Sequence, residues 1–488
     1  MMRSHPFVKA AAACLFFILL IWPTDAAGQE RFRKSPPAPE PLPELRLPPI
    51  ERHTLSNGLQ LAVVPRPRSP FMHLRLIIQA GEVDSPENRP GVAALTAALL
   101  NRGTVALSAA DIEERIEGLG AVFQASAHMD YSSFSMTFLE EHLDDALELL
   151  KTLLLQAAFS ARETESAKKA MYYELVEKSR DPEFVANRHM FRLLFEGHPY
   201  AKIAYPEEAL TAVGQKDIAA FFESFYKPNN AILVLTGNLN IGLASRKVSH
   251  HLNTWASRKI ERDFIPPPPP NKKLRVAFID VPRSRDAVIS TANVIMPPTG
   301  ADLLPFLVLN HVLGGTTGSR LFLNLRETNQ YAYYAFSETE FFRTCGVFRT
   351  RARITPDAAS PALREILQEL QAAVEETITP FDIEQAKAFL IGNFPLRIES
   401  LENVSRRASL IALFNLGEDH WNRYYDGMRR VNLNAVRDVA RNYLQLPPIA
   451  VIAGSRDRIV DTLRNFEVVQ IYDAKGILRS TIVKGVEK

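Results

Sequence analysis

A run of five prolines near the middle of the chain limits its fold more than any other feature. It lies in the stretch IPPPPPNKK, which occupies positions 265–273 of 488. Because proline has no backbone N–H and a fixed φ, five in succession join neither a helix nor the interior of a sheet. The stretch therefore predicts a semi-rigid spacer. We place a Pro-rich linker at residues 263–274, between two halves of similar length.

The two halves repeat one another. The first ends near FYKPNNAILVLTGN and the second near NYLQLPPIAVIAGS, with Tyr226 and Tyr443 in the same place. Each of these tyrosines precedes a glycine by 11 positions. Both stretches predict the end of a helix, a proline-containing turn and then a strand that ends in glycine.

Other elements recur in the same order. Residues 131–139 and 346–354 alternate between polar and apolar side chains, as half-buried strands do. Each is followed by a segment with apolar residues at helical spacing, at 142–154 and 362–374. The pattern predicts an α+β fold with two homologous domains, 51–262 and 275–488. Each domain is expected to hold a largely antiparallel sheet with helices packed on one face.

The N-terminus is typical of a secretory signal peptide. Residues 1–28 have a positive start, an apolar run over 10–22 and small residues at 26–28, where cleavage is expected. The alternative is an uncleaved N-terminal anchor. Residues 29–50 are rich in proline and predict an extended leader. We therefore expect a periplasmic or extracellular protein with no stable membrane insertion after signal cleavage.

Composition argues against a nucleic-acid-binding protein and against a disulfide-stabilised one. Lysine and arginine total 57 against 55 aspartate and glutamate, which argues against nucleic acid as a partner. Cys345 is the only cysteine after the predicted signal peptide, so the exported chain forms no internal disulfide. Its stability must come from its apolar core.

Several segments, in the order in which they follow one another along the chain, resemble one known family. They are HTLSNGLQLAVVP, AGEVDSPENRPGVA, HPYAKIAYPEEAL and LGGTTGSRLFLNLRETNQYAYYA. The chain resembles the insulinase/pitrilysin family of zinc metallopeptidases, in particular bacterial members related to mitochondrial processing peptidase. The resemblance runs from Arg52 to about Ser480. It implies the metallopeptidase-like (LuxS/processing-peptidase type) form of the two-domain fold.

The resemblance breaks at the family's zinc helix, which carries a histidine, then two residues, a glutamate and a second histidine. In GVAALTAALLNRGT, residues 91–104, these positions are Ala94, Ala97 and Ala98. Two histidines one turn apart hold Zn²⁺ while the glutamate acts as a general base on bound water. The family's third ligand falls on Glu174, but one carboxylate does not make a zinc site. We expect no metal and no catalytic residue on this chain alone. We therefore expect Glu174, at this orphan third-ligand position, to be an ordinary surface or ion-paired glutamate.

The second half keeps a different feature of the family. In active members, an arginine and a tyrosine seven residues later reach toward the substrate. The resemblance places them at Arg326 and Tyr333, within the motif at 314–335. A guanidinium binds a peptide carbonyl or carboxylate, and a phenol donates to an oxyanion. The alternative is a structural Arg–Glu pair and a core tyrosine.

One strand adds a row of arginines. Arg349, Arg351 and Arg353 fall on one face of the strand at 346–354. If the helix-free face of this sheet lines a substrate chamber, the row favours acidic peptides or peptide C-terminal carboxylates. A solvated surface is the alternative.

These observations lead to a functional hypothesis. The resemblance implies a non-catalytic, substrate-binding subunit of an exported heteromeric zinc peptidase. Such a subunit supplies the Arg/Tyr half of a shared chamber to a zinc-bearing paralogous subunit, in a heterodimer. The substrate is then a peptide or unfolded polypeptide, and the zinc belongs to the partner. The alternative is a peptidase-derived scaffold or peptide-binding protein with no hydrolytic role.

Overall fold

The computed structural model describes residues 49–488, apart from 270, 272, 376, 418 and 445–446. The predicted signal peptide and almost all of the predicted leader therefore lie outside the described residues. Within the described part, no helix is long and apolar enough to cross a membrane.

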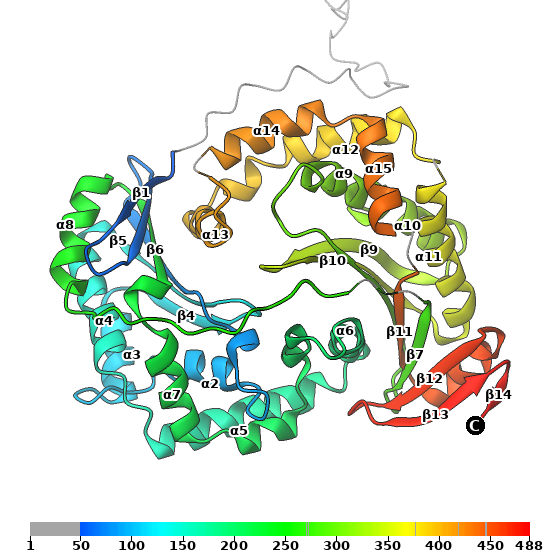
Figure 1. The fold of residues 1–488 in the computed structure, drawn as a ribbon, viewed down its shortest axis with the longest axis horizontal. Helices are drawn as coiled ribbons and strands as arrows, with labels where there is room; N and C mark the ends of the chain where they lie inside the picture. Colours follow the sequence, from blue (N-terminus) through cyan, green and yellow to red (C-terminus); the bar gives the residue numbers. More distant parts are fainter. Residues whose placement is uncertain (1–48, 270, 272, 376, 418, 445–446) are drawn as a thin grey trace, which may run out of the picture. The chain divides into compact units, whose positions relative to one another are not determined.

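The first half folds around a six-stranded sheet (Figure 1). Its order is β1-β2-β6-β3-β5-β4. Only β2 and β6 run parallel; the other neighbours are antiparallel. The strands are β1 (Glu51–Thr54), β2 (Gln60–Pro65), β3 (Phe71–Ile78), β4 (Val122–Ala127), β5 (Ser132–Leu139) and β6 (Ala231–Gly237).

The second half repeats this arrangement in an eight-stranded sheet, in the order β14-β13-β12-β7-β11-β8-β10-β9. Its β7-β11-β8-β10-β9 portion matches β2-β6-β3-β5-β4, including the parallel first pair. The α+β prediction with two largely antiparallel sheets is therefore confirmed. The strands are β7 (Arg275–Asp280), β8 (Ala287–Ile295), β9 (Ala332–Phe341), β10 (Gly346–Ile354), β11 (Ile449–Gly454), β12 (Val468–Asp473), β13 (Leu478–Val483) and β14 (Val486–Glu487).

Most helices pack on the sheet of their own half. In the first half, Leu95 of α2 and Leu150 of α4 lie in one apolar core with Leu76 of β3. These helices are α2 (Val92–Leu99), α3 (Ala109–Gly118), α4 (Leu143–Leu155), α5 (Ala161–Lys178), α7 (Gln215–Phe225) and α8 (Ile241–Leu252). The second half holds α9 (Leu303–Gly314), α10 (Arg320–Phe322), α11 (Ala359–Val374), α12 (Pro380–Gly392), α14 (His420–Arg430), α15 (Leu433–Leu444) and α16 (Arg456–Ile459).

Two helices cross to the other half. Helix α6 (Pro182–Leu194) packs against β8 and β11 of the second sheet, where Val185 shares a core with Val288. Helix α13 (Leu401–Leu413) packs against β2, β3 and β6 of the first sheet. The second face of each sheet is therefore covered by a helix of the opposite half. The premise of a helix-free sheet face is wrong, because local periodicity does not reveal which sheet an amphipathic helix will meet.

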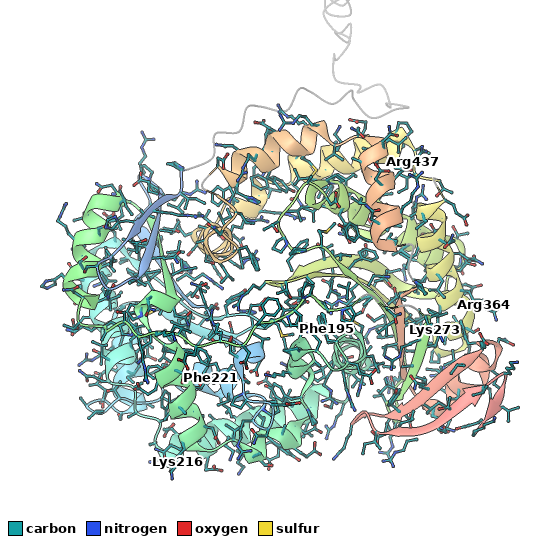
Figure 2. All side chains as sticks on the ribbon, viewed as in Figure 1. Phe195, Lys216, Phe221, Lys273, Arg364 and Arg437 are labelled. Carbon is teal, nitrogen blue, oxygen red and sulfur yellow. The ribbon has the colours of Figure 1, made fainter. Side chains whose placement is uncertain are left out.

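Aromatic rings fill the region where α6 meets the second half. Phe195, labelled in Figure 2, is 1% exposed. Its ring lies 5.4 Å from that of Tyr200 and 6.1 Å from that of Phe342, measured between centroids. Tilted and edge-on contacts of this kind add to the energy of burial. They join residues from both halves of the chain.

The C-terminal hairpin is held tightly by α6. The Nε2 atom of His189 donates to the carbonyl of Ala474 at 3.1 Å, in the turn between β12 and β13. Gly476 in the same turn has φ of 81°, and a Cβ there would lie 1.9 Å from Nη1 of Arg192. Only glycine fits this position without displacing the arginine.

His189 is expected to make the fold sensitive to acid. Burial lowers the pKa of His189 from 6.5 to about 4. In the unfolded chain this histidine therefore binds a proton near pH 6.5, whereas in the native state it binds one only near pH 4. The stability contributed by the neutral ring is complete above pH 6.5 and falls by up to about 3 kcal/mol as the pH drops to 4. His189→Gln keeps a donor for Ala474, and urea titrations at several pH values should show a shallower loss for this variant. An equally steep loss would contradict the assignment.

Candidate functional site

The predicted degenerate zinc helix forms as α2, and its N-terminal end is held by specific backbone contacts. Gly91 precedes α2 with φ of 86°, and a Cβ there would lie 2.7 Å from Cδ2 of Leu210. The carboxylate of Glu82 accepts from the backbone N–H groups of Gly91 at 3.1 Å and Ala94 at 2.9 Å. The Ser85 hydroxyl also donates to it, at 3.0 Å. Burial raises the pKa of Glu82, and these hydrogen bonds oppose that shift. A buried carboxylate therefore caps the first turn of the helix.

The three alanines at the family's zinc-helix positions differ in burial. Ala97 is 1% exposed within the apolar core, while Ala94 and Ala98 are half-buried. Helix α5 packs against α2. A methyl group offers no lone pair to a metal and accepts no proton. In the described ranges, no three histidine, cysteine, aspartate or glutamate residues come together to hold a metal ion.

Glu174 lies on the surface of α5. Its side chain is 60% exposed and accepts from Nζ of Lys178, one turn along the helix, at 2.6 Å. An exposed pair of this spacing contributes only a few tenths of a kcal/mol. Glu174 is thus an ion-paired surface glutamate, as the sequence analysis expects.

Arg326 and Tyr333 line the same cleft. Arg326 lies in a π-helical turn, Leu323–Thr328, a conformation often found at functional sites. Tyr333 is on β9 and is 52% exposed. The cleft, of about 350 Å³, also includes Tyr331 and Thr355. Two residues that the sequence pattern separates by seven positions are therefore presented together at the surface.

The contacts of Arg326 are weak. Its Nη1 atom donates to the carbonyl of Ala332 at 3.4 Å, and its Nε atom lies 3.9 Å from Glu327. Both interactions are at the long end of their classes. The guanidinium is half exposed, so a carbonyl or carboxylate ligand would meet little competition there.

The arginine row of β10 is already paired. Arg349, Arg351 and Arg353 point toward the start of α6 and are partly buried. Their partners are four carboxylates and one amide: Asp181, Glu183, Asn187, Asp286 and Glu338. An acidic peptide would have to displace these groups. The predicted preference for acidic peptides remains a prediction, and the pairing lowers its expected strength.

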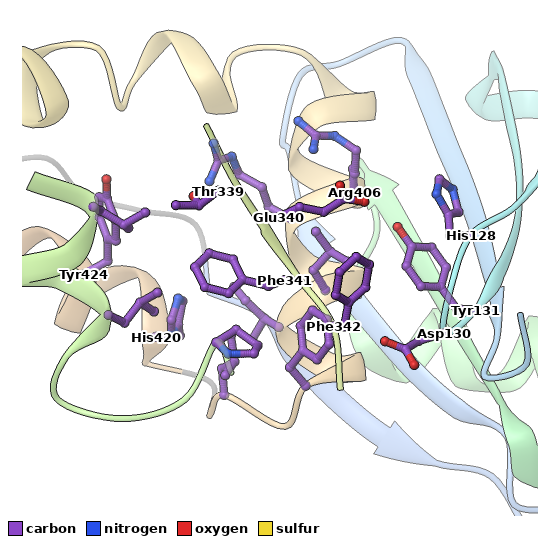
Figure 3. A pocket seen from close by; sticks show the side chains of 18 of the residues that line it. His128, Asp130, Tyr131, Thr339, Glu340, Phe341, Phe342, Arg406, His420 and Tyr424 are labelled. Carbon is purple, nitrogen blue, oxygen red and sulfur yellow. The ribbon is translucent and has the colours of Figure 1, made fainter. Parts of the chain in front are cut away.

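A larger pocket was missed by the sequence analysis. Its volume is about 410 Å³, and it draws its lining from the β4–β5 turn, the β9–β10 hairpin and helices α13 and α14 (Figure 3). The aromatic residues near 341 and 421 carry some signal of a binding site. A linear pattern does not show that segments 80 residues apart meet. The pocket was therefore not predictable from these aromatic residues.

Two family models and several curated proteins match the chain. Residues 61–206 match the insulinase family (peptidase family M16), and residues 212–390 match the peptidase M16 inactive domain. The non-peptidase homologue YmxG of Helicobacter pylori is 26% identical over 354 residues, which cover 71% of this chain and 80% of that protein.

Two crystal structures share the fold. A peptidase M16 inactive domain from Pseudomonas fluorescens has a TM-score of 0.77 at 21% identity, covering 83% of this chain and 98% of that one. A protease from Helicobacter pylori has a TM-score of 0.78 at 20% identity, covering 84% and 100%. Identity at this level supports the fold alone.

Proposed function

Because the chain belongs to the insulinase family, peptidase family M16, yet lacks that family's zinc-binding residues, we propose that it is a non-catalytic subunit of an exported zinc peptidase. It binds substrate jointly with a zinc-bearing paralogous subunit in a heterodimer. The zinc and the general base belong to the partner. The substrate is a peptide or an unfolded polypeptide.

One observation carries the proposal: the cleft that Arg326 and Tyr333 share. The half-exposed phenol of Tyr333 is free to donate to an oxyanion, and the lightly held Arg326 is free to bind a substrate carbonyl. In a scaffold with no hydrolytic role, nothing requires such donors at the surface. That second candidate function has no comparable feature in its favour.

The test is reconstitution with a paralogue that carries an intact His-x-x-Glu-His helix. The chain alone should hold no stoichiometric zinc and cleave no peptide. The mixed complex should bind zinc and cleave peptide. The Arg326→Ala/Tyr333→Phe double variant should assemble normally but lower kcat/KM about 100-fold, because it removes two donors to the reacting carbonyl.

Arg162→Ala is the matched control, since the Arg162 side chain is 94% exposed on α5. It should leave kcat/KM unchanged. Full activity of the complex with the double variant would refute the proposed role, as would cleavage by the zinc subunit without this chain.

A further inference from the structure

The pocket of about 410 Å³ shares no residue with the cleft of Arg326 and Tyr333. Residues 128–131 of the first half line it together with residues of the second half, which come from 298–307, from 339–342, from Phe394 and from several positions between Arg406 and Tyr424. The pocket is therefore a second concave site of ligand size, built from both halves of the chain.

Its lining is mostly apolar and rich in aromatic rings. The rings of Phe394 and Tyr424 stack with centroids 4.9 Å apart, and Phe341 and Trp421 also line the space. Rings of this kind hold a large flat or branched side chain. The volume of about 410 Å³ lies within the usual range of ligand sites and is large enough for such a side chain.

Two arginines, Arg406 and Arg407, line the pocket together with two carboxylates, Asp130 and Glu340. Arg407 is held by the carbonyl of Arg397 at 3.3 Å and lies 5.7 Å from the centre of the Phe394 ring. In the part of the chain that the structure describes, the guanidinium of Arg406 has no hydrogen bond or ion pair. Burial lowers the pKa of Arg407, and the nearby Arg397 and Arg406 lower it further. An anionic ligand would relieve this repulsion.

The carboxylates of the pocket leave Arg406 available. Asp130 accepts from the backbone N–H of Arg343 at 2.7 Å and from the Tyr200 hydroxyl at 3.3 Å. Glu340 faces the same space as Tyr131 and Arg406 (Figure 3), and burial raises its pKa. The Glu340 carboxylate repels a bound anion and so weakens its affinity for the pocket. Replacing Glu340 with a neutral residue should therefore raise that affinity.

The histidines of the pocket add no charge at neutral pH. Burial lowers the pKa of His128 to about 4, and it also lowers the pKa of His420. Both rings are therefore neutral at pH 7. The ionic character of the pocket comes from its two arginines and from the carboxyl groups of Asp130 and Glu340.

We propose that this pocket binds the C-terminal residue of a peptide, with its large apolar or aromatic side chain among the rings and its α-carboxylate on Arg406. The proposal rests on the proposed function, because it assumes that the chain handles peptides. A chain end fits better than an internal segment. An internal segment would bring a second run of amide groups into an apolar lining that offers few partners for them.

The experiment is calorimetric titration of the purified exported chain, without any partner subunit, with three peptides. They are acetyl-Ala-Ala-Phe as the free acid, the same peptide as its C-terminal amide, and acetyl-Ala-Ala-Ala as the free acid. We expect the first to bind and each of the others to bind at least about tenfold more weakly. Equal affinity for the acid and the amide would overturn the proposal.

Two variants should move the affinity in opposite directions. Arg406→Gln should bind the acid no better than the amide, and Glu340→Gln should bind the acid more tightly. Arg162→Gln is the control for loss of a surface charge and should behave as the unmodified chain. An unchanged affinity in Arg406→Gln, with a normal melting temperature, would also overturn the proposal.

The outcome is separable from that of the proposed function. In titrations of the lone chain, the difference between the unmodified chain and Arg406→Gln reports on the pocket, whereas reconstituted activity of the double variant reports on the cleft of Arg326 and Tyr333. Failure of peptide binding with a normal 100-fold loss in the double variant would remove the pocket and keep the subunit role. The reverse result would keep the pocket and remove that role.

Discussion

Replacing Arg188 with alanine should lower the free energy of unfolding by about 3–5 kcal/mol. Arg188 and Glu207 form an ion pair at 3.3 Å whose side chains are only 6% and 9% exposed. The guanidinium also donates to the carbonyl of Ala474 at 2.7 Å and lies over the ring of Phe184. Alanine removes all of these contacts and leaves the Glu207 carboxylate buried without its partner. Urea unfolding monitored by circular dichroism measures the change.

Two further variants make this result specific. Arg180→Ala removes an exposed pair with Glu177, both about 70% exposed, and should cost less than about 1 kcal/mol. The double variant Arg188→Met/Glu207→Leu removes both charges and should recover much of the stability lost in Arg188→Ala. A loss below 1 kcal/mol in Arg188→Ala itself would mean that water reaches the pair.

Glu82→Ala should destabilise the protein by about 2–4 kcal/mol. The change leaves the N–H groups of Gly91 and Ala94 and the hydroxyl of Ser85 without their shared acceptor in a fully buried place. Each lost bond to a charged acceptor carries its own desolvation cost. The free energy of unfolding, again from urea titration, reports the sum.

The matched control lies at the start of α3. Ser108 accepts from the backbone N–H of Asp111 at 3.2 Å at an exposed N-cap. Ser108→Ala should cost about 1 kcal/mol, because water replaces the lost acceptor. Equal losses in the two variants would show that the Glu82 carboxylate is not the buried cap described above.

Local elements were predictable because their signals are local. The period-two pattern at 346–354 became β10 with the same bounds. Ser160 caps α5 through an equally local contact, accepting from the N–H of Glu163 at 3.2 Å. The crossing of α6 and α13 was not predictable. An amphipathic face indicates that a helix is covered but does not indicate which of two similar sheets covers it.

The candidate site was predictable to the same degree. The family resemblance indicated Arg326 and Tyr333 within one motif, and both residues line one cleft, while their role stays a prediction. The partners of the β10 arginines were not foreseen, because Glu183 precedes Arg351 by 168 residues and reaches it only through the crossing of α6. The Arg406 pocket depends on the other crossing helix, α13, which packs against the first sheet although it belongs to the second half.

The exchanged helices bear on how the protein can be divided. If the chain is cut within the proline spacer, each fragment keeps a sheet with one bare face and carries the helix that the other fragment needs. Neither piece is complete, and each exposes apolar surface that favours aggregation. Produced together, the two fragments hold mutually complementary surfaces, which is the arrangement that a split-protein reporter requires.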